Sequence, residues 1–544
     1  MSRQENKKSI GFIIFAIILS VTLVVFTGGL VYQIFKLQIL PDNILIPIIL
    51  VLILLTLIFV LLINFSAHGL VSKILCSLMV VVLSAVYGLG NYYLYSTNTT
   101  LETVTDQGNK AKNTVSVVVL NSSGLENVNS LEASKLGVLK TIGNEATKKS
   151  LTDLKKNNVT YTKKTYDNML GMLKALYDGE VDAIVLNEAY RSNVCDLEDY
   201  TNFNNDTKVI HKTVYYTKEN SSSLAVSDIT SKPFNILISG NDSFGSLDEN
   251  SRSDVDMLVT INPVTSTILL TSIPRDSYVK EVCNDYACNY GVYDKLTHTG
   301  IYGVDTTKDT IENLLDIDIN YVYRVNFTSM IDIVDALGGV DVTVPEGMAV
   351  SKFYTNSNLE GVHEGENHLD GKRALAYSRE RKAYLDGDLQ RARNQQQVLQ
   401  AMFKKATSPE IIKNYTSLLK ALIGAFDTNM TTKEITSFIK YQIQAKPSWK
   451  FEQFVLKGDN DLRMSAELGS EVSVVILYDS YINIAHDKIQ AVLDGQSSDT
   501  VEADDDVPAG TLSEEEIEAQ IQYGLMTEAP IDEEGSEIYY GTGN

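Results

Sequence analysis

Acidic and basic residues gather where short apolar runs of the sequence begin or end. The residues at these positions are Asp242, Arg252, Asp254, Arg275 and Asp276. Arginine presents a planar fork that binds phosphate oxygens through two parallel hydrogen bonds, whereas lysine offers a point charge. Carboxylates bind hard cations such as Mg²⁺ or Mn²⁺ through oxygen. Aspartates together with several arginines therefore suit a pyrophosphate that is bound with a divalent cation.

A second group of charged residues lies further along the chain. Arg379 and Arg381 are two apart, so their side chains would share a face in an extended segment. Asp388 and Arg391 are three apart at the start of a helix predicted over 388–407, and they too would share a face. Surface ion pairs explain most single Arg–Asp neighbours. A phosphate site is favoured here because these residues adjoin apolar runs and because arginine outnumbers lysine among them.

Other catalytic classes lack their signatures in this sequence. It contains no GxSxG elbow and no GxxxxGK[ST] loop, which argues against a serine hydrolase and a P-loop enzyme. His298, His363 and His368 do not have HExxH spacing and suit core or surface positions better. No cysteine spacing indicates zinc, but Cys283 and Cys288 could close a local disulfide in an exported chain.

The charge distribution argues against nucleic acid as a partner. The formal net charge is −23, whereas nucleic-acid binders need a concentrated basic surface. Residues 491–544 contain fifteen Asp and Glu and no Lys or Arg. A segment of this kind with few large apolar residues is typical of a solvated, disordered tail.

Three long apolar runs near the N-terminus predict membrane-spanning helices. They cover residues 10–34, 44–63 and 74–93. Each is close to the ~20 residues that a helix needs to cross ~30 Å of hydrocarbon. Arg3, Lys7 and Lys8 before the first run, with Lys73 in the next inner loop, favour a cytoplasmic N-terminus. Three crossings then place everything after Tyr93 outside the cell.

An accessory α/β domain is predicted over 114–230, after a polar linker over 94–113. Strands are expected at 115–120, 159–162 and 183–186, and helices within 130–150 and at 166–177. Alternating strands and helices suggest a small parallel sheet. The stretch LYDGEVDAIVLNEAYRS also looks like one lobe of a periplasmic solute-binding protein, although a purely structural lobe is equally expected.

A second α/β unit is predicted over 232–490. Strands are expected at 234–239, 255–261, 267–273, 340–344 and 373–379, and further helices at 309–315 and 327–337. The turn Asn262-Pro263 joins two of these strands into a hairpin. Thr431 and Glu434 have the spacing of a capping box at the start of another helix. We therefore expect an α/β or α+β sandwich.

From about residue 233 to residue 400 the sequence resembles the LytR–CpsA–Psr (LCP) family of Gram-positive cell-wall enzymes. The matching segments, in family order, are NILISGNDS, SRSDVDMLVTINPVTSTILLTSIPRDSYV, YDKLTHTGIYGVDTTKDTIENLL, INYVYRVNFTSMIDIVDALGGVDVTVP, HLDGKRALAYSRERK and GDLQRARNQQQVL. The resemblance implies an LCP-type α-β-α sandwich as the catalytic domain. The three membrane spans and the preceding lobe also resemble the longer members of the family.

This resemblance implies a phosphotransferase activity. Such an enzyme would move a glycopolymer, for example a teichoic acid or a capsular polysaccharide, from undecaprenyl pyrophosphate in the membrane lipid to peptidoglycan. A muramic-acid hydroxyl would attack the sugar-proximal phosphate and leave undecaprenyl phosphate. Two alternatives stay open: an extracellular ligand-binding sensor, and a pyrophosphatase that uses the same pocket. The short cytoplasmic parts argue against the sensor because they could hold no output domain.

The resemblance also implies roles for individual residues. Asp242 and Asp254 would ligate Mg²⁺, and the residues that would grip the pyrophosphate or line the head-group site are Arg252, Arg275, Arg379, Arg381, Arg391, Lys295 and Gln395. Asp276 or Asp388 could act as the general base, or either could orient an arginine. At two positions where family members frequently have arginine, this sequence has other residues: Phe244 and Asn394.

Overall fold

The computed structural model describes residues 10–67, 69–106, 111–140, 144–195, 197–217, 225–241, 250–283, 288, 290–408, 411–422 and 424–503. The chain divides into two compact units. The first comprises Met1–Thr105 and Thr431–Ser448, and the second comprises Asp106–Met430 and Trp449–Asn544.

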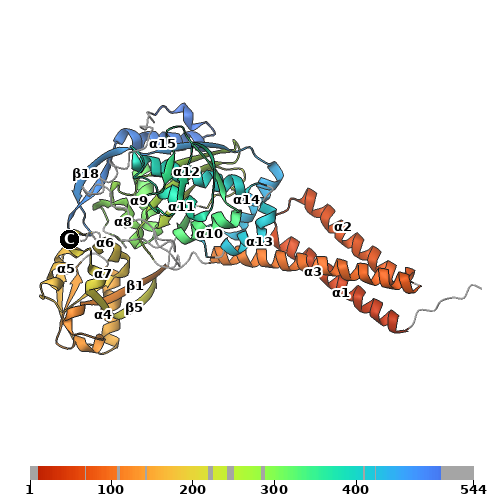
Figure 1. Cartoon of the computed structure of the whole chain (residues 1–544), viewed down its shortest axis with the longest axis horizontal. Coiled ribbons are helices and arrows are strands. Elements are labelled where there is room, and N and C mark those ends of the chain that lie inside the picture. Colours follow the sequence, from red (N-terminus) through yellow and green to blue (C-terminus); the bar gives the residue numbers. More distant parts are fainter. Residues whose placement is uncertain are drawn as a thin grey trace, which may run out of the picture. The chain divides into compact units, whose positions relative to one another are not determined.

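The first unit contains three long apolar helices, drawn in red to orange in Figure 1. They are α1 (Ile10–Leu37), α2 (Asp42–Leu61, continued by a π-helical turn at Leu62–Ser66) and α3 (Leu70–Asp106). Each is long and apolar enough to cross a membrane, which agrees with the three predicted spans. Residues 94–106, expected to belong to a linker, instead continue α3.

A fourth helix of the first unit comes from a distant part of the sequence. This helix, α14 (Thr432–Ala445), begins with the predicted capping box, in which Thr431 and Glu434 satisfy each other's backbone amides. Lys440 of α14 pairs with Asp42 at the start of α2, with 3.7 Å between Nζ and Oδ1. The segment 431–448, predicted within the second α/β unit, is therefore grouped with the apolar helices.

The accessory domain contains a mixed five-stranded sheet in the order β3-β2-β4-β1-β5. Its elements are β1 (Ala111–Leu120), β2 (Lys135–Leu139), α4 (Asn144–Lys156), β3 (Thr162–Tyr166), α5 (Met169–Tyr177), β4 (Ala183–Asn187), α6 (Arg191–Cys195), α7 (Phe203–Asp206) and β5 (Thr207–Thr217). The expected all-parallel sheet is wrong, because β1 runs antiparallel to both β4 and β5. The prediction of a helix within 130–150 is also wrong for the first half of that range, which contains β2, whereas the second half contains the start of α4. Periodicity does not separate a short apolar run such as KLGVL in a strand from one in a helix.

The predicted second α/β unit, which follows the accessory domain, is organised around a six-stranded sheet in the order β16-β11-β6-β7-β8-β17. Its strands are β6 (Phe234–Asn241), β7 (Val255–Asn262), β8 (Thr267–Ile273), β11 (Tyr321–Asn326), β16 (Phe426–Thr428) and β17 (Lys450–Val455). The predicted hairpin is confirmed, since β7 and β8 pair antiparallel from Asn262↔Thr267 onward. Strand β11 joins β6 in parallel, and β17 joins β8 in parallel.

Helices cover both faces of this sheet (Figure 1). On one face, α9 (Val304–Leu315) and α15 (Asp479–Leu493) pack on Leu258 and Leu269 in the main core. On the other face, α12 (Gly387–Ala406) is held by Gln396, whose amide donates to the backbone oxygens of Leu270 and Phe454. Helices α10 (Phe327–Leu337) and α11 (Gly371–Arg379) pack beside α12. The predicted α-β-α sandwich is therefore confirmed.

Short ribbons and helices complete the domain. They are β9 (Tyr278–Lys280), β10 (Tyr293–Lys295), α8 (Leu296–Thr299), β12 (Val340–Val344), β13 (Val350–Lys352), β14 (Glu360–Val362), β15 (Gly365–Leu369), α13 (Ile411–Leu422), β18 (Gly458–Met464) and β19 (Glu471–Leu477). The disulfide that Cys283 and Cys288 could close is present. Of the predicted acidic tail, residues up to Leu493 complete α15, and residues 504–544 lie outside the described part of the chain.

Candidate active site

Asp254 and Arg275 form the centre of a charged cluster at the ends of β7 and β8. Asp254 precedes β7, Arg275 follows β8, and their Oδ1 and Nη1 atoms are 2.7 Å apart. Thr297 donates a second hydrogen bond to the same Oδ1 at 3.2 Å. Only 6% of the Asp254 side chain and 16% of the Arg275 side chain are exposed. The antiparallel hairpin therefore brings together two residues that lie 21 positions apart in the sequence.

A close backbone approach fixes α8 and the following turn against this cluster. A Cβ on Gly300 would lie 2.6 Å from both the Ser251 oxygen and the Ser253 nitrogen, so only glycine fits there. Ser253 in turn donates its backbone amide to the Thr297 oxygen at 2.9 Å. The backbone around Asp254 and the segment that carries Thr297 are thus locked together.

Asp276 lies between two cations. Its Oδ1 is 2.7 Å from Lys295 Nζ, and its Oδ2 is 3.6 Å from Arg275 Nε. Burial raises the pKa of this carboxyl, but the charges of Arg275, Lys295 and Arg391 outweigh burial and hold the pKa well below its usual range. A carboxylate stabilised in this way is a weak proton acceptor. Asp276 is therefore better suited to orienting Arg275 and Lys295 than to acting as the general base.

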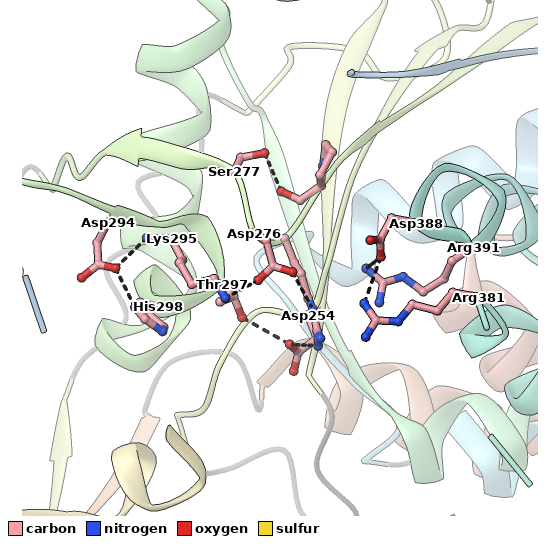
Figure 2. Close-up of polar contacts among 12 residues, drawn as sticks. Asp254, Asp276, Ser277, Asp294, Lys295, Thr297, His298, Arg381, Asp388 and Arg391 are labelled. Atoms are coloured by element: carbon pink, nitrogen blue, oxygen red, sulfur yellow. Dashed lines mark hydrogen bonds and ion pairs between the residues drawn. The ribbon is translucent and has the colours of Figure 1, made fainter. Parts of the chain in front are cut away.

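Arg381, in the turn after α11, and Arg391 of α12 form a second part of the cluster. Arg381 Nη1 and Arg391 Nη2 lie 3.2 Å and 3.3 Å from the same Oδ1 of Asp388. Figure 2 shows both guanidinium groups directed toward the group that contains Asp254 and Asp276. Both arginine side chains are about nine-tenths buried, whereas Asp388 is 48% exposed. Asp388 is thus the more accessible of the two candidate bases.

The expected strand over 373–379 is wrong, because these residues form most of α11. Asp370 caps this helix by accepting the amide of Arg373 at 2.8 Å. Arg379 ends the helix with its guanidinium 4.4 Å from the centre of the Phe327 ring, a cation–π contact. Arg379 and Arg381 therefore do not lie on one face of an extended segment.

A tight turn after α11 places Arg381. Glu380 is fully buried and accepts the backbone amides of Tyr354 at 2.6 Å and Ala383 at 3.2 Å, which holds the turn in shape. A Cβ on Gly387 would lie 2.4 Å from the Arg381 oxygen, so α12 can begin this close to the turn only with glycine.

Helix α12 positions the remaining predicted residues. Gln395 lies one turn after Arg391 and is partly exposed, so the two share a face of the helix. Asn394 lies at a position where family members often have arginine. It is fully buried, and its side-chain amide donates to the Tyr377 backbone oxygen at 3.0 Å. Asn394 therefore joins α12 to α11 and takes no part in the charged cluster.

Arg252 lines a small cavity beside the cluster. The cavity is also lined by Ser239, Asn241, Asn250, Val304 and Arg324. Arg252 is thus placed by the loop before β7, close to Asp254 in sequence. Asp242 and Phe244 lie outside the described residues, so the predicted role of Asp242 stays a prediction.

The described residues fit a divalent cation only in part. Asp254 offers carboxylate oxygen and Thr297 a hydroxyl beside it, which are the hard donors that Mg²⁺ prefers. Among the residues that the structure describes, no three His, Cys, Asp or Glu side chains converge as a metal site. This arrangement suits a cation that takes most of its oxygens from substrate phosphates, as Mg²⁺ commonly does.

Sequence reasoning missed several residues that position the cluster. Thr297 contacts Asp254, Phe327 contacts Arg379, and Glu380 holds the turn that carries Arg381. No spacing distinguishes these three from ordinary core residues. Asp294 and His298 have the i, i+4 spacing of a helical pair, which is a usable signal. Their Oδ1 and Nδ1 atoms are 2.9 Å apart, and both side chains are buried.

Asp294 also receives hydrogen bonds from the turn between β18 and β19. Its Oδ2 accepts from Ser465 Oγ at 2.9 Å and from the Glu467 amide at 3.0 Å. The same turn contacts the accessory domain, where the Leu170 amide donates to the Leu468 oxygen at 3.0 Å. The accessory domain is therefore linked through this turn to the strand that carries Lys295.

Buried arginines and carboxylates gathered at the ends of β7 and β8 suit an enzyme that handles phosphorylated substrates. The sequence profile of the LytR_cpsA_psr family matches residues 199–475, slightly more than half of the chain. Together with the relatives below, this match shows that the chain belongs to the LytR–CpsA–Psr family.

The relatives with assigned names are transferases. Over 243 residues the chain is 34% identical to the polyisoprenyl-teichoic acid–peptidoglycan teichoic acid transferase TagU of Bacillus cereus, covering 43% of this chain and 73% of TagU. It is 34% identical to the corresponding transferase TagT of Bacillus subtilis over 240 residues, covering 43% of this chain and 72% of TagT.

Solved structures from the same group resemble the chain over about half its length. The structure titled TagT bound to LI-WTA is 29% identical with a TM-score of 0.40, and the match covers 51% of this chain and 98% of TagT. Protein gbs0355 of Streptococcus agalactiae is 26% identical with a TM-score of 0.42, covering 54% of this chain and 96% of gbs0355.

Proposed function

We propose that this protein transfers a glycopolymer from a polyprenyl pyrophosphate to peptidoglycan on the outer side of the membrane. The observation that carries the proposal is the charged cluster, in which Arg275 pairs with Asp254, and Arg381 and Arg391 share Asp388. Membership of a family whose named relatives are glycopolymer transferases supports the same conclusion. The cluster would bind the pyrophosphate, which all such donors share. It therefore does not distinguish a teichoic acid from a capsular polysaccharide.

The cluster suits stabilisation of a phosphoryl transition state. Buried guanidinium groups act at low local dielectric, where they stabilise developing phosphate charge more strongly than in water. Arg381 and Arg391 are each about nine-tenths buried, and their shared partner Asp388 keeps both aimed at one side of the site. A polyanionic pyrophosphate would take the place of Asp388 as the partner of some of these guanidinium groups. Bound Mg²⁺ would neutralise further charge, with Asp254 and Asp242 as its protein ligands.

In the proposed reaction a hydroxyl of peptidoglycan attacks the sugar-proximal phosphorus. A new phosphorus–oxygen bond forms to the acceptor, the bridging phosphorus–oxygen bond breaks, and polyprenyl phosphate leaves. Asp276 and Asp388 are the two candidates for removing the acceptor's proton: Asp388 is half-exposed, and Asp276 is held ionised by three cations. Asp276 also keeps Arg275 and Lys295 in position.

The sequence and the three apolar helices support the proposed outer location. Arg3, Lys7 and Lys8 precede α1, so the positive-inside rule favours a cytoplasmic N-terminus. If each of the three apolar helices crosses the membrane, the chain after α3 would be on the side on which peptidoglycan is built. Anchoring by α1–α3 would also hold the site near the lipid-borne donor.

Reconstitution of the full chain in detergent tests this proposal. Purified protein with Mg²⁺, a polyprenyl-pyrophosphate-linked glycan and soluble peptidoglycan fragments should release polyprenyl phosphate and form a glycan–peptidoglycan product. Removing one transition-state charge commonly costs about 10²–10³ in rate, so Arg381→Ala should lose activity by that factor and keep its unfolding temperature. Undiminished activity in a folded Arg381→Ala protein would show that the cluster is not the site. Binding of the donor without turnover would favour the sensor instead.

A further inference from the structure

The ribbon formed by β9 and β10 extends from the active site to the protein surface. The two strands pair antiparallel, with Lys295 opposite Tyr278 and Tyr293 opposite Lys280. Residues directly opposite each other in such a pair project from the same face. The outer face of the ribbon therefore carries these four residues, which we call the tyrosine ledge. The inner face carries Asp294 and is buried.

The ledge is continuous with the catalytic cluster. Lys295 at its inner end is 2.7 Å from Asp276, as Figure 2 shows. From Ser277, next to Asp276, to Lys280 the chain advances three residues, which corresponds to roughly 10 Å along an extended strand. The exposed residue Lys280 marks the outer end. A chain-like ligand could therefore lie along the ledge with one end at Asp276.

The two tyrosine rings form an exposed aromatic surface on the ledge. Tyr293 is 51% exposed, and its ring centre lies 5.6 Å from that of Tyr278 at an interplanar angle of 36°. Tyr278 is fixed because its hydroxyl donates to the Met464 oxygen at 3.1 Å. Exposed apolar surface beside a functional site commonly marks a binding surface. Tyrosine combines an apolar ring face with a polar tip, which matches a sugar ring with its C–H face and hydroxyl rim.

We propose that the tyrosine ledge binds the saccharide chain of the acceptor, a peptidoglycan strand, and leads its reacting hydroxyl to the catalytic cluster. This inference rests on the proposed function. Two observations favour the acceptor over the glycan of the donor. Arg381 and Arg391 approach the cluster from one side, and the ledge joins it from the other, at Lys295 (Figure 2). An in-line displacement brings the attacking group in opposite the leaving group.

Charge on the ledge supports the same occupant. Lys280 at its outer end is exposed, and Lys295 lies at its inner end. Peptidoglycan carries peptide stems with free carboxylates, and cations flanking two aromatic rings would attract these groups while the rings pack against sugars. The ledge therefore has cations at both ends and an apolar centre.

Steady-state kinetics with the full chain tests the ledge. Acceptor and donor concentrations are varied separately for Tyr293→Ala, with Tyr293→Trp as the variant that keeps an aromatic face. Tyr216→Ala is the matched control, because Tyr216 is 63% exposed and lies on β5 of the accessory domain. Loss of one aromatic packing partner typically weakens binding by about tenfold. We expect the KM for peptidoglycan fragments to rise by that factor in Tyr293→Ala, with kcat and the donor KM unchanged.

Each other result contradicts the inference. An unchanged acceptor KM in Tyr293→Ala, or an equal effect of Tyr216→Ala, would exclude the ledge as an acceptor site. A rise in the donor KM alone would place the donor glycan there instead. A separate calorimetric titration with peptidoglycan oligosaccharides distinguishes this failure from failure of the proposed function. If the wild-type protein does not catalyse transfer, binding that is weakened in Tyr293→Ala and kept in Tyr293→Trp still supports the ledge, whereas equal binding by all variants refutes it.

Discussion

The hydrogen bond from Thr297 to Asp254 gives a sharp test of the proposal that Asp254 binds a divalent cation. Thr297→Val replaces the hydroxyl by a methyl group of the same shape and leaves the surrounding packing intact. Asp254 then keeps Arg275 at 2.7 Å but loses the donor at 3.2 Å from the same oxygen. The carboxylate would become less firmly oriented, although its charge would remain.

The expected magnitude follows from the geometry of this bond. Hydrogen bonds to charged groups contribute about 1.5–3 kcal/mol, and a 3.2 Å bond belongs near the lower limit of that range. Loss of a residue that orients a metal ligand commonly costs about 10–100-fold in metal affinity. We therefore expect the half-saturating Mg²⁺ concentration of Thr297→Val to rise about tenfold.

The assay measures the initial rate of polyprenyl phosphate release over a range of Mg²⁺ concentrations. Saturating Mg²⁺ should restore most of the activity of Thr297→Val, because the arginines of the charged cluster are unchanged. Thr297→Ser keeps the hydroxyl and should behave like the wild type. An identical Mg²⁺ dependence in wild type and Thr297→Val would refute the assignment of Asp254 to the cation, and a loss that Mg²⁺ does not restore would assign Thr297 to another role.

Two further substitutions test positioning and stability. Gly387→Ala places a methyl group 2.4 Å from the Arg381 oxygen, and because misplacement by about 1 Å can cost about 10²-fold in rate, we expect kcat/KM to fall by that factor. Gly28→Ala, with no atom within 4 Å, is the control and should be unaffected. Burial raises the pKa of Glu467 from 4.5 to about 7, so between these values the folded state binds the extra proton and stability falls as pH rises. By pH 7 the free energy of unfolding should have fallen by roughly 3 kcal/mol. Glu467→Gln should abolish this pH dependence in thermal unfolding measured from pH 5 to 8. An equal dependence of stability on pH in both proteins would contradict this.

Much of the fold follows from local sequence patterns. Helix α10 and strand β12 have the predicted bounds, because each is a periodic apolar segment with a clear stop, such as Gly338 after α10. The hairpin β7–β8 is equally local. The errors arise where tertiary packing decides between structures. Residues 373–379 read as a strand but form α11, because Asp370 caps them as a helix and the turn at Glu380 ends it.

The candidate site is only partly predictable for the same reason. The charged residues at the ends of apolar runs are predictable because arginine and aspartate are unusual there. Their supporting contacts are not, since Thr297 meets Asp254, Phe327 meets Arg379 and Asp294 meets Ser465 only after distant segments pack together. At Asn394 the resemblance to the family misleads in the opposite direction. Family members often have arginine at this position, but here the residue is buried and joins α12 to α11.

The most direct test of the proposed activity follows the oxygen that attacks the phosphorus. The full chain is incubated with donor, Mg²⁺ and peptidoglycan fragments in water labelled with heavy oxygen, and the products are identified by mass spectrometry. Transfer predicts a glycan phosphate joined to peptidoglycan that contains no heavy oxygen, because the acceptor hydroxyl supplies the new bond. Free glycan phosphate carrying one heavy oxygen as the main product, whatever the acceptor concentration, would instead identify the protein as a pyrophosphatase.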